Sequence, residues 1–457
     1  MGFFSCWSFL WDIFHNDKHL STVIETEGCQ RIGSRICDLP DDLLLRILHY
    51  VQTKDAVATS ILSKRWRYVW TMLPRLEFKD DGSESVGWFT EKSLQLHKAP
   101  KLYSLIVEVG PHCPVDVDVG KWVENAVNRG VEVLDFKLLW TAQPTSFPKC
   151  LYTCDTLVEL ALSNEILVDV SSPAFLPSLL YLSLHDVVYK DDESLVRLLS
   201  SSPVLKLLSV YRHEDDTLKY FTVKVSSLET LFYRTNWRRN YFDVDEVEED
   251  QAVDDEYLIG SLFIDSPALK KLYFNDAWDL VIDNMPCLDV ASFSYVHNPS
   301  DKFLQSLSSV IHLDFLLTKA MAACCSATKF SRLTEIYFYP DNSVDWLEPL
   351  MSLLQNSPKL KSLTIETCIE GLPPSWNQPS SIPECLSSHL EIFFWKGYGG
   401  RGDERQLVTY ILANSKCLKT VEISFIATSN PEDTQKELES MPRISTSSRL
   451  VFPTQLK

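Results

Sequence analysis

The chain has 457 residues, 45% of them hydrophobic, and a formal net charge of −19 at pH 7. This apolar content is ordinary for a folded soluble protein, and the acidic balance argues against general nucleic-acid binding, which needs a basic face. The twelve cysteines show no C-x-x-C and no zinc-type spacing. The only N-x-S/T triplet, Asn298-Pro299-Ser300, cannot be N-glycosylated because of its proline. We therefore expect an intracellular protein of the cytoplasm, the nucleus or both.

The first fourteen residues, MGFFSCWSFLWDIF, place aromatic and leucine side chains at helical spacing. The run is too short to cross a bilayer and lacks the basic start of a signal peptide. Cys6 stands where a myristoylation signal has Ser or Thr. We interpret residues 1–30 as an extension that packs on the following domain or stays unstructured, and membrane contact is the less favoured alternative.

Residues 38–74 predict three short helices. Asp38 is the expected N-cap of the first, and Pro40 fits its first turn. Thr53 and Ser63 are the expected caps of the second and third helices. The apolar stripe of the first helix is formed by Leu44, Ile47, Leu48 and Val51. The three helices carry more apolar side chains than so small a bundle can bury, so the surplus contacts a partner or packs on the following domain.

The same stretch resembles an F-box of the plant type, which we place at residues 31–78. The opening L-P-D-x-L-L-x-x-I-L begins at Leu39, and the block T-K-D-A-V-x-T-S-x-L-S-K-R-W-R runs from Thr53 to Arg67. The resemblance implies docking on the Skp-type adaptor of a Skp–cullin–F-box ubiquitin ligase, and through it contact with cullin and RING subunits. The adaptor-binding residues that it implies are Leu39, Pro40, Leu44, Ile47, Leu48, Val57, Ile61, Lys64 and Trp66. The first five would enter the adaptor's groove, and the last four would extend the contact or hold the helices in shape.

After residue 95 the chain repeats the pattern L-x-x-L-x-L. Its first apolar positions are Leu102, Val133, Leu157, Leu179, Leu205, Leu228, Leu269, Leu288, Val310, Leu333, Leu360, Leu390 and Leu418. Most spacings lie near the 20–29-residue period of leucine-rich repeats, which stack because one unit cannot bury its own leucines. We therefore predict an α/β fold, in which a solenoid of irregular, plant-type leucine-rich repeats occupies residues 96–355. An ordinary parallel α/β sheet is the alternative.

One spacing of 41 residues indicates an insertion at about 236–259. It contains the acidic run DVDEVEEDQAVDDEY at residues 243–257. A solvated loop is the simpler interpretation of such a run. The sharper hypothesis is an acidic lip that selects basic segments of a target.

Residues 356–457 are expected to hold the last repeats and a module that resembles the FBD module, at about 373–425. The residues that carry this resemblance are Trp376, Pro383, Cys385, Leu386, Leu390, Trp395, Gly397, Tyr398, Gly400 and Glu404. We interpret the module as a cap on the open edge of the solenoid.

The sequence contains no nucleophile elbow, phosphate-binding glycine loop or H-E-x-x-H motif, so we expect a protein without catalytic activity, cofactor or metal. Two hypotheses remain. In the first, the chain is the substrate-recognition subunit of a ubiquitin ligase, with an unknown protein target. In the second, it is a repeat scaffold that engages no ligase. A small-molecule co-ligand in the repeat concavity stays open, although no residue pattern requires one.

Overall fold

The computed structural model describes residues 36 and 39–453, with gaps at 81, 83–85, 115–116, 141–142, 172, 214–217, 219, 236–260, 276–279, 284, 297–298, 300–301, 326–327, 342–343, 368–378, 380 and 427–430. The expectations for the N-terminal extension, for the cap at Asp38, for the acidic insertion and for Trp376 lie outside the described residues. The chain divides into two compact units, Met1–Ile47 and Leu48–Lys457.

In the first unit the described structure is the beginning of helix α2 (Asp41–Leu48), whose last residue opens the second unit. The amides of Leu43 and Leu44 donate to the carbonyl oxygen of Pro40, both at 3.1 Å. Pro40 therefore lies at the start of the first turn and accepts its first hydrogen bonds, and its missing N–H is not needed there.

The second unit begins with the other helical turns of the F-box stretch. They are α3 (Thr53–Ala58), η3 (Thr59–Ile61), α4 (Trp66–Val69) and η4 (Trp70–Met72). The caps predicted at Thr53 and Ser63 are wrong, since Gln52 and Arg65 precede the helices and neither caps through its side chain. The Thr53 hydroxyl instead accepts a hydrogen bond of 2.7 Å from the amide of Glu77. The Thr53 hydroxyl therefore binds an amide 24 residues away in the sequence, and not an amide of the helix that it was predicted to cap.

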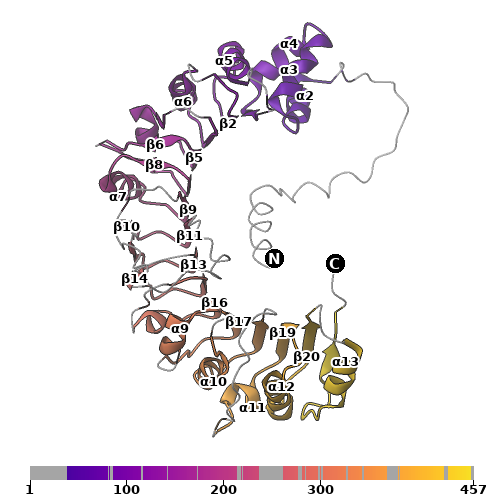
Figure 1. Ribbon diagram of the computed structural model, residues 1–457. Helices are drawn as coiled ribbons and strands as arrows, with labels where there is room; N and C mark the ends of the chain where they lie inside the picture. Colours follow the sequence, from indigo (N-terminus) through magenta and orange to yellow (C-terminus); the bar gives the residue numbers. More distant parts are fainter. Residues whose placement is uncertain are drawn as a thin grey trace, which may run out of the picture. The chain divides into compact units, whose positions relative to one another are not determined.

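Among the described residues, a parallel sheet of fifteen strands forms the framework of this unit, and the strands follow one another in sequence order. They are β1 (Arg75–Phe78), β2 (Ser104–Val109), β3 (Val133–Leu138), β5 (Glu159–Asn164), β7 (Tyr181–His185), β9 (Leu207–Arg212), β11 (Thr230–Thr235), β13 (Lys271–Asn275), β15 (Val290–Phe293), β16 (His312–Leu317), β17 (Glu335–Pro340), β18 (Ser362–Glu366), β19 (Ile392–Tyr398), β20 (Thr420–Phe425) and β21 (Arg449–Val451). Figure 1 shows them stacked in a curved row. Strict sequence order is what stacked repeats produce, so the predicted solenoid is confirmed.

The leucine pattern locates the strands, with one error of register. Twelve of the thirteen predicted first positions are buried, and a strand begins two residues after each of these twelve; the exception is Val133. Val133 is only half-buried, whereas Val131, Leu134 and Phe136 are fully buried. The true pattern there is therefore V-x-x-L-x-F from Val131. Val133 directly precedes the buried Leu134, and because neighbouring side chains of a strand point to opposite faces, Val133 lies on the face away from the core.

In the part of the chain that the structure describes, helices and two small sheets cover the outer side of the curved row (Figure 1). The small sheets are β4 (Thr145–Ser146), β6 (Ile166–Val168) and β8 (Val188–Tyr189), and β10 (Tyr220–Lys224), β12 (Ser261–Asp265) and β14 (Leu280–Asp283). The helices are α5 (Val86–Leu96), α6 (Val119–Val127), η5 (Lys149–Thr153), α7 (Asp192–Ser200), α8 (Phe303–Ser306), α9 (Lys319–Cys324), α10 (Leu347–Gln355), α11 (Glu384–Ser388), α12 (Gly402–Asn414) and α13 (Pro431–Ser440). The apolar side chains of the row are packed between the sheet and this outer layer.

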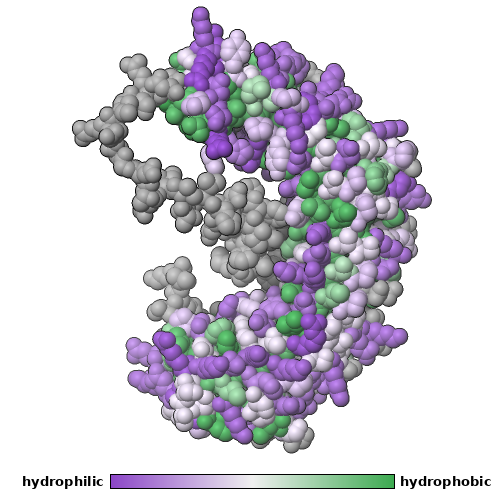
Figure 2. Space-filling view, turned by 180° about the vertical axis from the view of Figure 1, so that it is seen from behind, coloured by the Kyte–Doolittle hydropathy of each residue, from purple (hydrophilic) through white to green (hydrophobic). Residues whose placement is uncertain are grey.

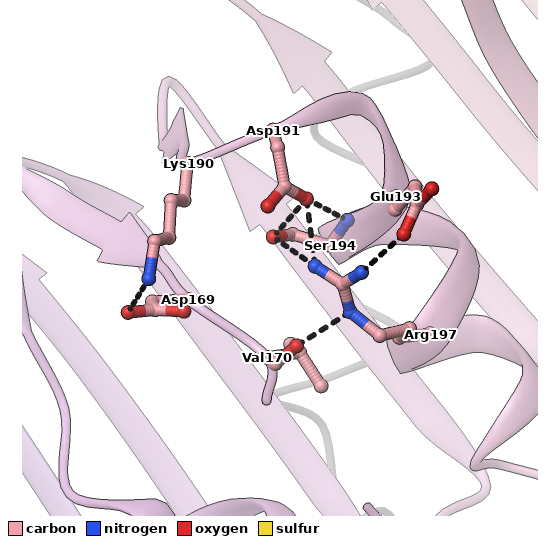
Figure 3. Close-up of polar contacts among 7 residues, drawn as sticks. All are labelled: Asp169, Val170, Lys190, Asp191, Glu193, Ser194 and Arg197. Carbon is pink, nitrogen blue, oxygen red and sulfur yellow. Dashed lines mark hydrogen bonds and ion pairs between the residues drawn. The ribbon is translucent and has the colours of Figure 1, made fainter. Parts of the chain in front are cut away.

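A charged cluster on the outer layer anchors helix α7 (Figure 3). Asp191 caps the helix, since its Oδ1 accepts from the amide of Ser194 at 2.6 Å. The Arg197 guanidinium donates to the same oxygen at 2.7 Å and to the carbonyl oxygen of Val170, also at 2.7 Å. Arg197 therefore ties the helix to the segment that follows β6. The cluster has a structural role that these contacts account for.

The residues that suggested an FBD module pack the C-terminal end of the row. The indole of Trp395 is buried and donates to Thr367 Oγ1 at 3.0 Å. Gly397 has φ of 76°, and a Cβ there would lie 2.0 Å from the carbonyl oxygen of Thr367, so only glycine fits. Glu404 is buried and accepts from the amides of Gly399 and Arg401 at 3.1 and 3.0 Å. The sheet continues beyond this module to β21, so the last strand of the row is β21 and lies outside the module that we interpreted as the cap.

The junction between the F-box turns and the first repeats is held by buried hydrogen bonds. The amide of Lys98 donates to the carbonyl oxygen of Thr71 at 2.8 Å. His97 Nε2 lies 2.8 Å from the carbonyl oxygen of Leu73, and Nδ1 lies 2.6 Å from Arg129 Nη2. Because a guanidinium only donates, Nδ1 accepts and the neutral ring donates through Nε2. Burial, with the charge of Arg129 as a smaller cause, lowers the pKa of His97 to about 4.

Acid should weaken this junction. The pKa of His97 is 6.5 when the ring is exposed and about 4 in the folded chain, so stability falls as the pH drops below about 7. The loss in the free energy of unfolding should reach about 2 kcal/mol at pH 4.5. Urea unfolding from pH 7.5 to 4.5 should show a shallower dependence for His97→Gln than for the exposed control His112→Gln. Equal slopes in the two variants would contradict this account.

A second pH effect is expected on the sheet, with the opposite sign. Burial and the neighbouring Glu159 and Glu108 raise the pKa of Asp135 to about 6. The folded chain therefore holds this proton more tightly than the unfolded chain. The free energy of unfolding falls as the pH rises from about 4 to about 6, and the loss is complete above that range. Asp135→Asn should raise the free energy of unfolding by about 3 kcal/mol at pH 7.5 and by less than about 1 kcal/mol near pH 4. A gain of equal size at both pH values would argue against a titrating cause.

Candidate protein-binding surfaces

Several of the predicted adaptor-binding residues lie in the first unit, and they differ in exposure. Pro40 is exposed, Ile47 is 41% exposed and Leu39 is half-buried. Leu44 is fully buried. The helical stripe thus mixes a core residue with a surface residue. Leu43, which lies off that stripe, is 38% exposed and is a further candidate that the periodicity did not single out.

The predicted residues of the second unit divide in the same way. Leu48 and Trp66 are buried, and Val57 is half-buried. Ile61 is 88% exposed, and Lys64 is exposed as well. The buried side chains hold the helical turns in shape, whereas Ile61 and Lys64 are open to a partner. Their role in adaptor binding stays a prediction.

Further exposed apolar side chains lie on the turns next to Ile61, and none of them is among the predicted adaptor-binding residues. Helix α4 packs against η3, which brings the turns that carry them together. The F-box apolar surface, as we define it, consists of Ile61, Leu62, Tyr68 and Met72. Each is at least 41% exposed, and Lys98 Nζ lies 5.4 Å from the centre of the Tyr68 ring. The available signal was the excess of large apolar residues outside the predicted stripes.

The sheet provides a second extended surface, formed by the side chains that point away from the core. Each strand alternates buried and more exposed positions, so every second residue contributes to this sheet face. Near the C-terminal end of the row, the Tyr337 hydroxyl donates to Glu366 Oε2 at 2.5 Å, and Lys396 Nζ donates to Tyr337 Oη at 2.5 Å. Burial and the bond to Glu366 raise the pKa of Tyr337. These three side chains satisfy one another.

The visible surface lacks one dominant apolar area. Figure 2 shows hydrophobic residues in small groups among hydrophilic ones. Among the described residues, no group of His, Cys, Asp and Glu could hold a metal ion, and the cysteines are free thiols. No helix in the described part of the chain is long and apolar enough to cross a membrane.

Comparison with known proteins assigns both ends of this architecture. A model of the F-box domain matches residues 36–78, and a model of the FBD module matches residues 378–423. A third model, of the LRR repeats of an FBD-associated F-box protein, matches residues 119–264. The F-box match contains α2, the F-box apolar surface and β1, and the FBD match contains α11, β19 and α12.

Curated relatives extend the similarity to nearly the whole chain. A putative F-box/FBD/LRR-repeat protein of Arabidopsis thaliana is 70% identical over 98% of this chain and 97% of its own length. A putative FBD-associated F-box protein of the same plant is 47% identical over 94% of this chain and 99% of its own length. Identity of this extent over nearly the whole length shows that the chain belongs to the family of F-box/FBD/LRR-repeat proteins.

Proposed function

We propose that the protein is the substrate-recognition subunit of a Skp–cullin–F-box E3 ubiquitin ligase. The F-box would dock on a Skp-type adaptor, which connects it to cullin and RING subunits, and the repeats would bind the target. The observation that carries the proposal is the exposed apolar side chains on the turns of the F-box match. Exposed apolar clusters of this kind are typical of protein interfaces, whose energy is concentrated in a few central side chains.

The protein would act by position alone. It would hold the target close to the ubiquitin-carrying enzyme and so raise the effective concentration of the target's lysines. No cofactor, metal or catalytic residue of its own is part of this mechanism. The reaction would take place inside the cell, where ubiquitin ligases act and where cysteines stay reduced.

The junction at His97 supports this mechanism. Hydrogen bonds from Lys98 and His97 tie the turns of α4 and η4 to the first repeats. An adaptor bound to the F-box apolar surface would therefore keep a fixed direction relative to the sheet of the same unit. A fixed direction favours transfer, because the target and the ubiquitin-carrying enzyme then meet without a search over many orientations.

A repeat scaffold that engages no ligase is the second candidate function. The sheet face favours it as much as it favours the first, since a binding surface of this type needs no ubiquitin chemistry. The F-box apolar surface distinguishes the two functions, because a scaffold outside a ligase would not bind a Skp-type adaptor. Binding of a purified adaptor is therefore the decisive measurement.

Ile61→Asp should weaken adaptor binding strongly without harming the fold. Ile61 is 88% exposed, so a charge there meets water in the free chain but would be buried in the complex. We expect the Kd for the adaptor, measured by titration calorimetry, to rise at least tenfold, and the midpoint of thermal unfolding to stay unchanged. The matched control is Ile382→Asp, which introduces the same charge at a side chain that is 54% exposed in the FBD module.

Equal affinity of wild type and Ile61→Asp for the adaptor would argue against this docking surface. If the wild-type chain bound no Skp-type adaptor at all, the scaffold function would stand in its place.

Leu44→Ala should act through stability. Leu44 is fully buried, so its truncation leaves a cavity and should lower the stability of its surroundings by about 3 kcal/mol. Adaptor affinity should fall at 37 °C and recover at 10 °C, where the helix is folded. Hydrogen exchange of the α2 amides gives the local stability directly. A loss of affinity at both temperatures, with normal exchange protection, would instead identify Leu44 as a contact residue.

A further inference from the structure

The middle of the sheet face differs from its two ends in composition. Strands β7, β9, β11 and β13 pair in parallel register, so their outward side chains form three rows across the sheet. The first row contains Tyr181, Leu207, Thr230 and Lys271; the second contains Ser183, Ser209, Phe232 and Tyr273; the third contains His185, Tyr211, Arg234 and Asn275. We call these twelve positions the central face. It is rich in aromatic rings and contains no carboxylate.

The aromatic rings of the central face are held in place by one another. The rings of Phe232 and Tyr273 stack with centroids 4.6 Å apart and planes 10° from parallel. The guanidinium of Arg234 lies 5.2 Å from the centre of the Tyr211 ring. His185 Nε2 lies 2.9 Å from Ser183 Oγ and 3.1 Å from Ser209 Oγ. A surface arranged before the partner arrives loses little conformational entropy on binding.

The two cations of the central face have no carboxylate partner among the described residues. Arg234 and Lys271 are exposed, and neither forms an ion pair there. The neighbouring Lys270 behaves differently, since its Nζ lies 2.9 Å from Glu229 Oε2 at the edge of the sheet. Elsewhere on this surface cations are paired too, as in the contact of Lys396 with Glu366 at 3.5 Å.

Acidic groups lie on both sides of the central face along the row of strands. Toward the N-terminal end lie Glu108, Asp135 and Glu159, where burial and then the two glutamates raise the pKa of Asp135. Toward the C-terminal end, burial raises the pKa of Asp314, and Glu335 follows on β17. The cationic stretch is thus short and bounded, in a chain whose net charge is −19.

We propose that the central face binds an extended peptide segment in which two carboxylates flank an apolar side chain. Lys271 lies two residues before Tyr273 on β13, and Arg234 lies two residues after Phe232 on β11, so the stacked rings separate the two cations. Four residues along the strands and one strand spacing across them place the cation-bearing positions about 14 Å apart. An extended peptide covers that distance in about four residues, which favours Asp or Glu at positions i and i+4 with an apolar residue at i+2.

The charges determine how each part of the segment is recognised. The planar guanidinium of Arg234 can bind a carboxylate through two hydrogen bonds, and Lys271 offers a point charge. The apolar side chain would lie on the Phe232–Tyr273 pair, where it buries surface without displacing a polar group. A long polyanion such as single-stranded nucleic acid also prefers rings and cations, but it would meet the acidic groups on both sides. The inference rests on the proposed function only in assigning the segment to the ubiquitination target.

The test uses the full-length chain bound to its adaptor and a phage-displayed library of random twelve-residue peptides. Selected peptides should carry Asp or Glu four residues apart around an apolar residue. Their affinity, measured by fluorescence anisotropy, should fall at least tenfold in the double variant Arg234→Glu and Lys271→Glu. The matched control is Lys319→Glu with Lys329→Glu, which gives the same net charge at two exposed positions outside the sheet face. Circular dichroism and adaptor affinity should be the same in both variants.

Several results would overturn the inference. They are the selection of no peptide, the selection of basic peptides, and acidic peptides whose affinity the Arg234 and Lys271 reversal leaves unchanged. Binding of an oligo-dT probe that depends on the same two cations would make the face a nucleic-acid site instead. Failure of adaptor binding by the wild-type chain would affect the proposed function alone, because peptide selection can be repeated with the free full-length chain.

Discussion

Each repeat of this chain exposes its own leucines until a neighbour covers them, and the rest of the architecture follows from that constraint. The strands must stack in sequence order, and the stack must end somewhere. At one end helix α3 covers β1, where the Thr53 hydroxyl accepts from the amide of Glu77. At the other end the FBD packing around Trp395 leads into the short strand β21. Both ends therefore contribute to the same core, and short or covered edges protect a sheet from pairing with other chains.

The same alternation that builds the core leaves the other side of every strand unconstrained. Leu231 and Leu272 are fully buried, whereas their neighbours Phe232 and Tyr273 lie on the sheet face. Core positions must be apolar and close in volume, but face positions only have to tolerate water or a partner. The chain can therefore concentrate recognition in residues whose replacement leaves the fold intact. The F-box turns show a similar division, with Trp66 buried and Ile61 exposed.

The sequence allowed the repeats and the F-box to be predicted because their signals are local. A leucine pattern of period two locates a strand, and only at Val131 did a second apolar residue shift the interpretation. The small outer sheets could not be predicted, since a strand such as Thr145–Ser146 is too short to show a period. The cap at Thr53 was wrong because its partner lies 24 residues away. The central face could not be predicted from the sequence for the same reason. Phe232 and Tyr273 are distant in sequence, and their contact follows from the register of β11 and β13.

The pairing of β11 with β13 has a further consequence. Thr230 lies opposite Lys271, although the sequence between them contains the acidic insertion and the outer strand β12. The register across this detour is as regular as that between β9 and β11. A solenoid of this kind can thus lengthen a connection without moving the strands on either side. The length of a connection and the residues of the sheet face can therefore vary independently of the core that the stacked strands share.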